Sequence, residues 1–219
     1  MRPPAPAVLR YFPRSFRGLT QRLVKFGATG VLRLWQRITA HDAPDWSAVG
    51  PVILAPNHCS FADPVVLQLA SKRHLTFLMT QTVYRIWWAR WFFQLWRAVP
   101  MPDGGHSTEA LKAALQALQE GRSVTIFPEG GVSKDGCLQR GHGGVAWLSQ
   151  RSGVSVIPVA LCGTFEFLPR TAHWPRRGRI QVRFGAPLPP ASANQSATEY
   201  AATVMDAIHA LGAPRRAAP

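Results

Sequence analysis

The sequence predicts an α/β fold: a single domain with a largely parallel central sheet flanked by helices, preceded by an N-terminal amphipathic helix. Short apolar runs rich in β-branched residues alternate along the chain with longer stretches in which apolar residues recur every three or four positions. This alternation is typical of parallel sheets, whose strands are joined by helices. A chain of 219 residues is long enough for one such domain and a short appendage.

The first 40 residues are expected to lie outside the sheet. Residues 1–15 contain four prolines, so we expect a flexible N-terminal segment there. Residues 16–40 carry apolar side chains at three- and four-residue steps, with arginines and lysines between them, which predicts a basic amphipathic helix. Periodicity does not decide whether its apolar face lies on a membrane surface or packs on the domain, and both alternatives remain open.

The domain proper is expected over residues 45–211, followed by a flexible tail at 212–219. Strands are predicted at five short segments: residues 49–55, where the strand starts at Val49 or Val52, residues 75–79, 123–127 and 154–161, and the alternating residues 179–185. Helices are predicted at five periodic segments, residues 63–71, 83–99, 108–120 with Gly121 just past the end, 143–151 and 197–211. Asp63 is expected to be the N-cap of its helix and Pro64 the first helical residue, while residues 99–107 are expected to form a loop.

The segment 83–99 is the most aromatic part of the chain. It contains four tryptophans and two phenylalanines together with three arginines. That mixture favours a helix that lies at a membrane interface or covers an acyl-chain groove. An aromatic-rich core helix has the same periodicity and remains the alternative.

The composition indicates an anionic partner. The chain has 25 Lys and Arg against 11 Asp and Glu, a formal net charge of +14. Eight tryptophans and eleven phenylalanines favour an anionic membrane surface over nucleic acid, because such rings settle at headgroup level. A basic nucleic-acid-binding protein is the alternative on charge alone, although it leaves the motifs described below unexplained.

The cysteines and the hydropathy of the chain indicate its cellular compartment. Cys59, Cys137 and Cys162 are odd in number and widely spaced, which argues against a disulfide framework or a CxxC zinc site and for a reducing compartment. No uncharged apolar run reaches about 18 residues, and no apolar signal-peptide core follows the basic N-terminus. We therefore expect a peripheral protein on the cytoplasmic face of the inner or cell membrane.

Chemistry-bearing residues follow two of the predicted strands. His58 and Asp63 belong to NHCSFADP after the strand at 49–55, and Glu129 belongs to FPEGG after the strand at 123–127. Sites of open α/β sheets lie in the loops at the carboxyl ends of strands, so neighbouring strands would place these residues in one crevice. Histidine is the usual general base at neutral pH, and Asp63 could hold its tautomer. The alternative from spacing alone is that Asp63 only caps a helix and FPEGG is only a turn.

Other chemistries have weaker support in the sequence. No GxSxG is present, so a covalent serine mechanism is not indicated. Cys59 adjoins His58, and adjacent loop residues seldom point at each other, which argues against a cysteine nucleophile. We expect no metal site, because His58 and Asp63 lack an obvious third ligand, although His142 or Glu129 stays open as one.

Three blocks of sequence together resemble a known family. They are NHCSFADP at 57–64, FPEGG at 127–131 and VIPVAL at 156–161. In this order and spacing they are similar to the NHxxxxD, FPEG and proline-containing strand motifs of the glycerolipid acyltransferases, which include the 1-acylglycerol-3-phosphate O-acyltransferases and other lysophospholipid acyltransferases. The resemblance covers roughly residues 50–165.

The resemblance implies transfer of a fatty acyl group to the free hydroxyl of a lysophospholipid, with acyl-CoA or acyl carrier protein as co-substrate and no other cofactor. His58 would take the hydroxyl proton and Asp63 would hold the imidazole. The same resemblance places four further residues at the substrate site, Asn57, Glu129, Gly130 and Gly131. The glycines would let backbone N–H groups approach a phosphate or an oxyanion.

Two positions depart from the family pattern. Asp103 and Val132 stand where family members that act on lysophosphatidate typically carry arginines. Each departure removes a bidentate phosphate contact. Lys134, Arg140 or Arg97 could compensate, although a lysine supplies only a point charge. We therefore hold the hypothesis that the acceptor has a substituted phosphate, as in lysophosphatidylethanolamine. A lipid-binding relative without activity and a hydrolase that activates water with His58 are further alternatives.

Overall fold

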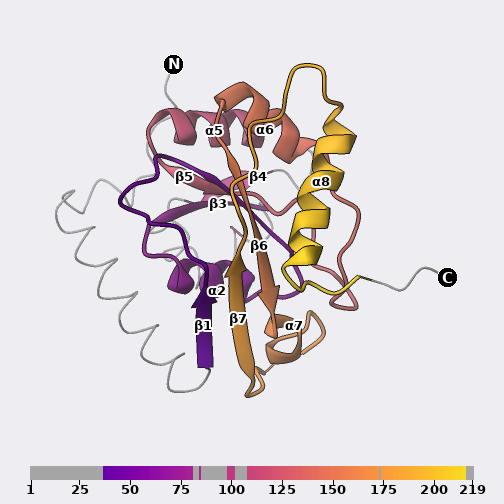
Figure 1. The fold of residues 1–219 in the computed structure, drawn as a ribbon. Helices are drawn as coiled ribbons and strands as arrows, with labels where there is room; N and C mark the ends of the chain where they lie inside the picture. Colours follow the sequence, from indigo (N-terminus) through magenta and orange to yellow (C-terminus); the bar gives the residue numbers. More distant parts are fainter. Residues whose placement is uncertain (1–36, 81–83, 85–97, 102–107, 173, 216–219) are drawn as a thin grey trace.

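The structure is a computed structural model that describes residues 37–80, 84, 98–101, 108–172 and 174–215. The described elements form a sheet with helices on both of its faces (Figure 1). In chain order they are β1 Arg37–His41, β2 Ile53–Pro56, α2 Asp63–Ala70, β3 Leu75–Thr80, β4 Val99–Met101, α5 Thr108–Gln119, β5 Ser123–Thr125, α6 Gly144–Ser152, β6 Val156–Cys162, α7 Thr164–Phe167, β7 Arg179–Phe184 and α8 Ala197–Ala210.

The sheet is largely parallel, as predicted. Its strand order is β1-β7-β6-β2-β5-β3-β4, and each pairing is parallel except that of β6 with β7. No long helix crosses from β6 to β7 in the described chain: the short α7 and a loop join them, so β7 starts at the edge where β6 ends. An antiparallel pair follows from that short return.

The central strand β2 fixes the geometry of the site. All four of its residues are buried, and Ile53 pairs in parallel with Val124 of β5 on one side and Val156 of β6 on the other. Strands that are covered on both faces have continuous apolar sequences, which explains why β2 is apolar throughout. The carboxyl ends of β2, β5 and β6 therefore lie at one edge of the sheet.

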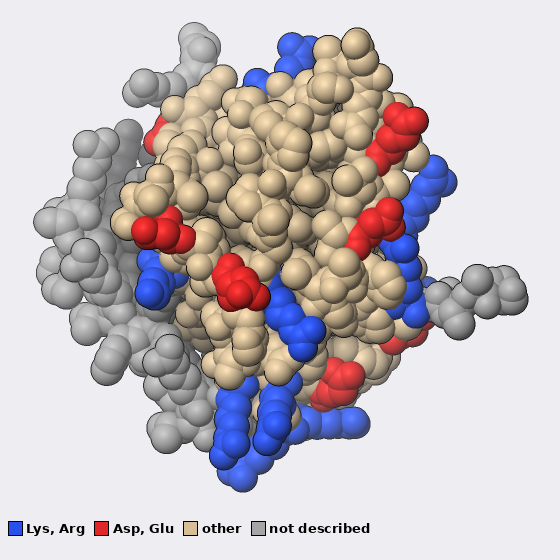
Figure 2. Space-filling view, viewed as in Figure 1, with Lys and Arg blue, Asp and Glu red and all other residues tan. Residues whose placement is uncertain are grey.

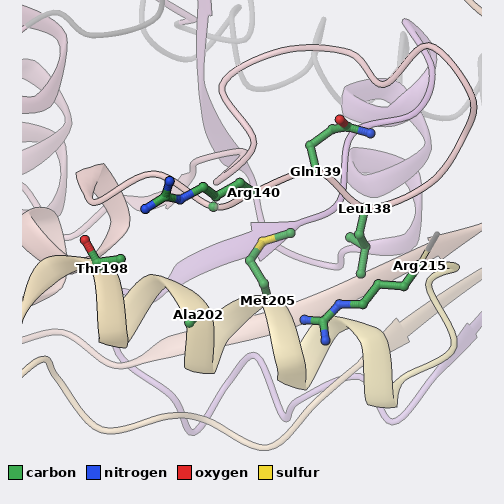
Figure 3. Close-up of a pocket in the computed structure, with 8 residues that line it drawn as sticks. Leu138, Gln139, Arg140, Thr198, Ala202, Met205 and Arg215 are labelled. Carbon is green, nitrogen blue, oxygen red and sulfur yellow. The ribbon is translucent and has the colours of Figure 1, made fainter. Parts of the chain in front are cut away.

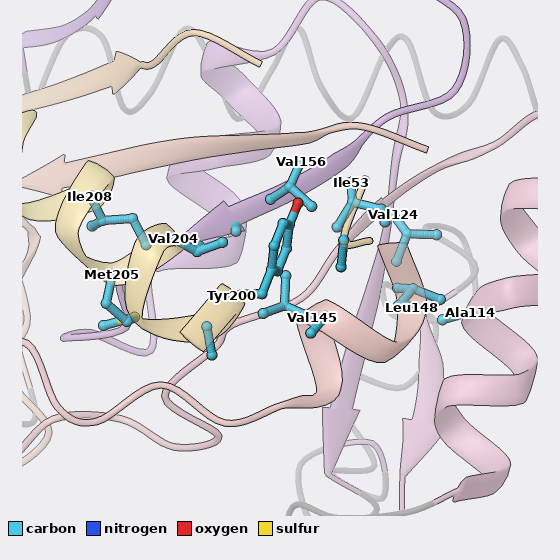
Figure 4. Close-up of a cluster of buried hydrophobic side chains, with 14 of the residues drawn as sticks. Ile53, Ala114, Val124, Val145, Leu148, Val156, Tyr200, Val204, Met205 and Ile208 are labelled. Atoms are coloured by element: carbon cyan, nitrogen blue, oxygen red, sulfur yellow. The ribbon is translucent and has the colours of Figure 1, made fainter. Parts of the chain in front are cut away.

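Each face of the sheet is covered by its own apolar core. On one face, side chains of α5, α6 and α8 meet those of the central strands, as Figure 4 shows for Leu148, Val204 and Ile208 around Ile53 and Val156. On the other face, Val66 and Leu67 of α2 pack with side chains of β2, β6 and β7. This two-sided burial keeps the strand ends, and the loops that leave them, in fixed positions.

Three features differ from the sequence-based expectation. Residues 37–40 form part of strand β1 instead of the end of the amphipathic helix, because pairing with β7 along Arg37–His41 overrides a weak helical periodicity. Residues 99–101 pair with β3 as strand β4 where a loop was expected, and the short helix α7 was not predicted. The remaining strands and helices that lie in the described chain are found with slightly shifted bounds.

Two predicted segments lie outside the described residues. They are the N-terminal stretch 1–36, which includes most of the predicted amphipathic helix, and residues 85–97 of the aromatic segment. The tail at 216–219 lies outside them as well. Their predicted roles stay predictions.

Candidate active site

His58 and Glu129 meet at the edge where β2 and β5 end. The two strands are neighbours, so the loops that follow them lie side by side, as the sequence analysis required. The His58 backbone N–H donates to Glu129 Oε1 at 2.7 Å, and the Ser133 N–H donates to the His58 carbonyl at 2.7 Å. The residues predicted from the two motifs therefore share one site.

Asp63 holds the His58 imidazole directly. His58 Nδ1 lies 2.9 Å from Asp63 Oδ2, and the Asp63 side chain is fully buried while that of His58 is 15% exposed. The backbone N–H groups of Cys59 and Ser60 donate to the same oxygen at 2.8 Å each. The predicted contact across five residues is confirmed, because the intervening loop folds around the carboxylate.

The predicted N-cap role of Asp63 is wrong. Ala62 is the N-cap of α2, and Asp63 lies in the first turn, next to Pro64. A side chain within a helix points back toward the helix N-terminus, so the Asp63 carboxylate reaches the preceding loop and not the amides of its own helix. In the described part of the chain, Asp63 Oδ1 has no hydrogen-bond partner.

The imidazole of His58 is oriented as a base would need it. Because the Asp63 carboxylate can only accept, Nδ1 carries the hydrogen and Nε2 keeps its lone pair. The Phe127 ring stacks on the imidazole with centroids 4.0 Å apart and planes at 23°. The stacked ring and the carboxylate together leave the imidazole little rotational freedom.

Glu129 joins three segments of backbone. Its Oε1 accepts from the His58 N–H, and its Oε2 accepts from the Gln139 N–H at 2.9 Å. The side chain is only 7% exposed, and this burial raises the pKa of Glu129 to about 7, although both backbone hydrogen bonds lower it. Glu129 fixes where the His58 backbone lies relative to the neighbouring loop.

Asn57 bridges the two strands on which the site rests. Its Oδ1 accepts from the Leu161 N–H at 2.7 Å, and its Nδ2 donates to the Leu161 carbonyl at 3.1 Å. The side chain is buried. Its carboxamide thus continues the β2–β6 pairing to the point where the loop that carries His58 begins. Contact with substrate stays a prediction for this residue.

The two glycines of FPEGG differ in what their backbones do. Gly130 has φ +69°, and its N–H donates to the Phe127 carbonyl at 3.1 Å, so it closes the turn. A Cβ at Gly130 would meet the His142 ring at 3.1 Å, whereas one at Gly131 would face open space. Within the described ranges, no hydrogen bond involves the Gly131 N–H. Gly131 is the better placed of the two to donate to a substrate oxygen.

Cys59 is unsuited to nucleophilic chemistry. It is buried, and its Sγ lies 3.1 Å from Thr164 Oγ1 of α7. Burial, together with the nearby Asp63 carboxylate, raises the pKa of the thiol well above its ordinary value, so the thiol stays protonated. The sequence-based exclusion of a cysteine nucleophile is consistent with this environment.

Sequence reasoning missed three residues of the site. They are Phe127, which stacks on His58, Gln139, which supports Glu129, and Thr164, which contacts Cys59. Phe127 belongs to the FPEGG motif, so the sequence could have identified it as a site residue. Gln139 contributes a backbone N–H, which any residue but proline would supply, and Thr164 lies 105 positions from Cys59, so neither carried a signal.

The positions that depart from the family pattern are partly described. Val132 is half-buried in the loop after FPEGG, and Lys134 and Arg140 are exposed in the same loop. Asp103 and Arg97 lie outside the described residues. The phosphate contacts proposed from the sequence therefore stay predictions.

A cavity of about 360 Å³ lies behind the Glu129 loop, away from His58. Figure 3 shows the segment 138–141 lying across α8, with Thr198, Ala202 and Met205 facing it. Arg140 and Arg215 complete the lining, and Arg215 is paired with Asp206 at 2.5 Å. The cavity borders the site only through Gln139.

No described helix is long and apolar enough to cross a membrane. Among the same residues, no group of three or more His, Cys, Asp and Glu side chains is placed to hold a metal ion.

Comparisons with known proteins agree with the geometry. The family model described as Acyltransferase matches residues 37–162, a range that contains His58, Asp63 and Glu129. Over 121 residues the chain is 31% identical to a chloroplastic 1-acyl-sn-glycerol-3-phosphate acyltransferase of Arabidopsis thaliana, covering 54% of this chain and 34% of that protein. A chloroplastic protein of the same description from Brassica napus is also 31% identical, with 54% and 35% covered. The match thus spans about a third of these relatives' length.

A solved structure has the same fold. The crystal structure of the 1-acyl-sn-glycerophosphate acyltransferase from Thermotoga maritima superposes with a TM-score of 0.76 and covers 97% of this chain and 88% of its own. The two sequences are 19% identical. At that identity the likeness establishes the architecture, which the packing described above explains.

Proposed function

The chain belongs to the acyltransferase family, and on that premise we propose that it moves a fatty acyl group from a thioester donor to the free hydroxyl of a lysophospholipid. The observation that carries the proposal is the His58–Asp63 pair, with Nδ1 held at 2.9 Å and Nε2 left to accept a proton. The family match covers this pair and the Glu129 loop that supports it.

In the proposed reaction His58 acts as general base. Nε2 takes the proton of the acceptor hydroxyl as its oxygen attacks the thioester carbonyl carbon. The resulting oxyanion collapses, the C–S bond breaks, and the leaving thiolate receives the proton from the imidazolium. The products are an acylated lipid and a free thiol, and no covalent acyl-enzyme forms.

The surrounding groups support charge that develops during this step. The buried Asp63 carboxylate stabilises the imidazolium, because the two charges face each other at hydrogen-bond distance away from bulk water. In the proposed reaction the Gly131 N–H donates to the oxyanion or to an acceptor phosphate; the open space beside Gly131 and the lack of a partner for this N–H among the described residues support that role. Glu129 keeps the two loops at the spacing that this arrangement needs.

We propose 1-acylglycerol-3-phosphate as the acceptor, following the descriptions of the relatives in Arabidopsis thaliana and Brassica napus. The proposed donor is acyl-CoA or acyl carrier protein. Val132 favours a second candidate: with an apolar side chain where an arginine is typical, the site would select a substituted phosphate such as that of lysophosphatidylethanolamine. The proposed partner besides these substrates is an anionic membrane surface, with the protein peripheral to it and no nucleic acid bound.

The function is tested by measuring thiol release and acylated lipid from purified protein in mixed micelles. The assay pairs palmitoyl-CoA or palmitoyl carrier protein with lysophosphatidate or lysophosphatidylethanolamine. We expect product from the wild-type chain and from a matched control, His41→Ala, which removes an exposed histidine. His58→Ala is expected to lower turnover at least about 100-fold, the usual contribution of a general base.

The outcomes separate the alternatives. Equal product from His58→Ala and His41→Ala would contradict the mechanism. Free fatty acid without acylated lipid would assign a hydrolase, and neither product from folded protein would assign a lipid-binding relative without activity. Val132→Arg is expected to shift the preference toward lysophosphatidate if the missing arginine sets headgroup selection.

A further inference from the structure

Two large apolar side chains are exposed in the described part of the chain, and they belong to the connections that follow β2 and β6. They are Trp174, at 83% exposed, and Phe61, at 53%. Phe61 follows His58 by three positions, in the loop that wraps Asp63. Trp174 belongs to the connection between α7 and β7. Rings exposed to this degree indicate an interaction surface when polar or charged side chains surround them.

Trp174 projects from a loop that is rich in arginine. Residues 163–185 contain five arginines and one acidic residue, Glu166 of α7. Of the five, Arg170, Arg176, Arg177 and Arg179 are exposed. Arg37, at the start of β1, is exposed and pairs in register with Arg179. We call Arg37, Arg170, Trp174, Arg176, Arg177 and Arg179 the basic-aromatic surface.

The fold brings these residues together at one end of the molecule. Figure 2 shows Lys and Arg side chains gathered at the lower end of the view, where Figure 1 places the starts of β1 and β7. The Arg176 N–H donates to the Phe167 carbonyl at 2.8 Å, which closes the loop that carries Trp174. This hydrogen bond anchors the two ends of the loop that carries the Trp174 ring and the arginine side chains.

This surface lies at the same sheet edge as the catalytic loop. β6 is parallel to β2, so the connection that leaves β6 starts beside the loop that leaves β2. Two contacts join them directly: Ser60 Oγ donates to the Leu168 carbonyl at 2.7 Å, and Cys59 Sγ contacts Thr164 Oγ1 at 3.1 Å. A flat partner that touched Trp174 would therefore lie at the sheet edge that carries His58.

We propose that the basic-aromatic surface docks on an anionic phospholipid bilayer and turns the His58 site toward the membrane. Guanidinium groups bind lipid phosphates bidentately, and an indole ring settles at headgroup depth, so the two kinds of side chain suit one partner. The five arginines of residues 163–185 outweigh the single negative charge of Glu166, so the net charge of this connection is positive. The proposal deepens the proposed function, because it names the residues that would contact the anionic membrane, and it rests on that function in that the acceptor is a lipid held in the membrane.

The test is co-sedimentation of the full chain with vesicles of phosphatidylcholine, with and without phosphatidylglycerol. Each basic residue near an anionic surface strengthens binding roughly fivefold. Replacing Arg170, Arg176 and Arg177 by Gln is therefore expected to weaken binding to the anionic vesicles by about 100-fold. The matched control replaces Lys72, Lys112 and Arg151 by Gln: the same charge is lost from exposed positions elsewhere, and binding is expected to fall about fivefold at most, because the altered charges lie away from the docked face.

Trp174 provides an independent readout that charge does not affect. Trp174→Ala is expected to weaken vesicle binding about tenfold, and Trp174→Phe to retain most of it, because a second aromatic ring still partitions into the interface. Turnover of substrate in detergent micelles should stay unchanged in all these variants. Vesicle binding needs no turnover, so a failure of the catalytic proposal would leave this test intact.

Three results would overturn the docking proposal. Wild-type protein that does not bind anionic vesicles would remove its premise. Equal losses in the arginine variant and the control variant would assign binding to net charge instead of this surface. Unchanged vesicle binding combined with lost turnover from acyl carrier protein, but not from acyl-CoA, would reassign the arginines to an acidic protein partner.

Discussion

The loops after β2 and β5 each bury one carboxylate that accepts hydrogen bonds from backbone N–H groups, and they use it differently. Asp63 receives three donors on one oxygen, all from residues 58–60, and one of these donors is the His58 ring itself. Glu129 uses both oxygens and joins backbone segments that lie 71 and 10 positions away in sequence. Asp63 therefore acts on the imidazole, whereas Glu129 acts on the positions of the loops.

The two carboxylates are therefore expected to have different roles, Asp63 in the chemistry of the imidazole and Glu129 in the structure of the loops. A charge beside the ring stabilises the imidazolium, so its removal should affect turnover first. A carboxylate between two backbone amides holds distances, so its removal should affect folding stability and turnover together. Substitutions at Asp63 and Glu129 test whether the two carboxylates have these different roles.

The largest effect is expected from Asp63→Asn. The amide oxygen can replace Oδ2 toward the N–H groups of Cys59 and Ser60, but the substitution removes the charge that faces the imidazolium. We expect kcat to fall by about 10³-fold with little change in KM. Steady-state kinetics and thermal melting of the same samples check this, and a loss of turnover that merely followed a loss of folded protein would break the comparison.

An intermediate effect is expected from Glu129→Gln, and it should depend on pH. Burial raises the pKa of Glu129 from 4.5 to about 7, so the folded protein binds this proton more tightly than the unfolded chain. The stability of the wild type relative to the variant is thus greatest below pH 4.5 and falls as the pH rises to about 7. At about 1.4 kcal/mol for each pH unit, the decrease is about 3 kcal/mol.

Urea unfolding of both proteins between pH 4.5 and 8 measures this difference. A constant gap across that range would show that the Glu129 carboxyl is not destabilised by burial. A gap that widened with rising pH would show that its two backbone hydrogen bonds dominate instead.

The smallest effect is expected from Cys59→Ala. The thiol is buried with a raised pKa, and its sulfur contacts Thr164 Oγ1 and Asn57 Nδ2, so we expect it to contribute packing and no chemistry. We expect a loss of about 1 kcal/mol in unfolding free energy and a kcat within about threefold of the wild type. Retention of an acyl group on Cys59, or abolished turnover in folded protein, would assign it the chemical role that we give to His58.

The same contrast explains how much the sequence could predict. The His58–Asp63 contact could be anticipated because only four loop residues separate the partners, so the loop can bring them together locally. The neighbouring positions of β2 and β5 were a condition of that prediction, and only the strand pairing shows that the condition is met. The role of Asp63 as N-cap was mistaken because capping depends on where the first helical turn begins, which Ala62 decides. Sequence patterns locate helix ends only to within a few residues.

What escaped prediction depends on long-range pairing. Strand β1 exists because β7 supplies backbone partners for residues 37–41, which a helical periodicity in the preceding residues does not reveal. The contact between Gln139 and Glu129 uses a backbone N–H and leaves no trace in residue type. The parallel pairing of β1 with β7 brings Arg37 beside Arg179, so the basic-aromatic surface also became visible only in three dimensions.

The most direct test of the account is the effect of Asp63→Asn on kcat in the His58→Ala background. If Asp63 acts through the imidazole, the substitution that costs about 10³-fold in the wild type should change the residual rate by less than about threefold once the ring is gone. The same 10³-fold loss in both backgrounds would mean that Asp63 contributes independently of His58. That result would contradict the assignment of the pair as one catalytic unit.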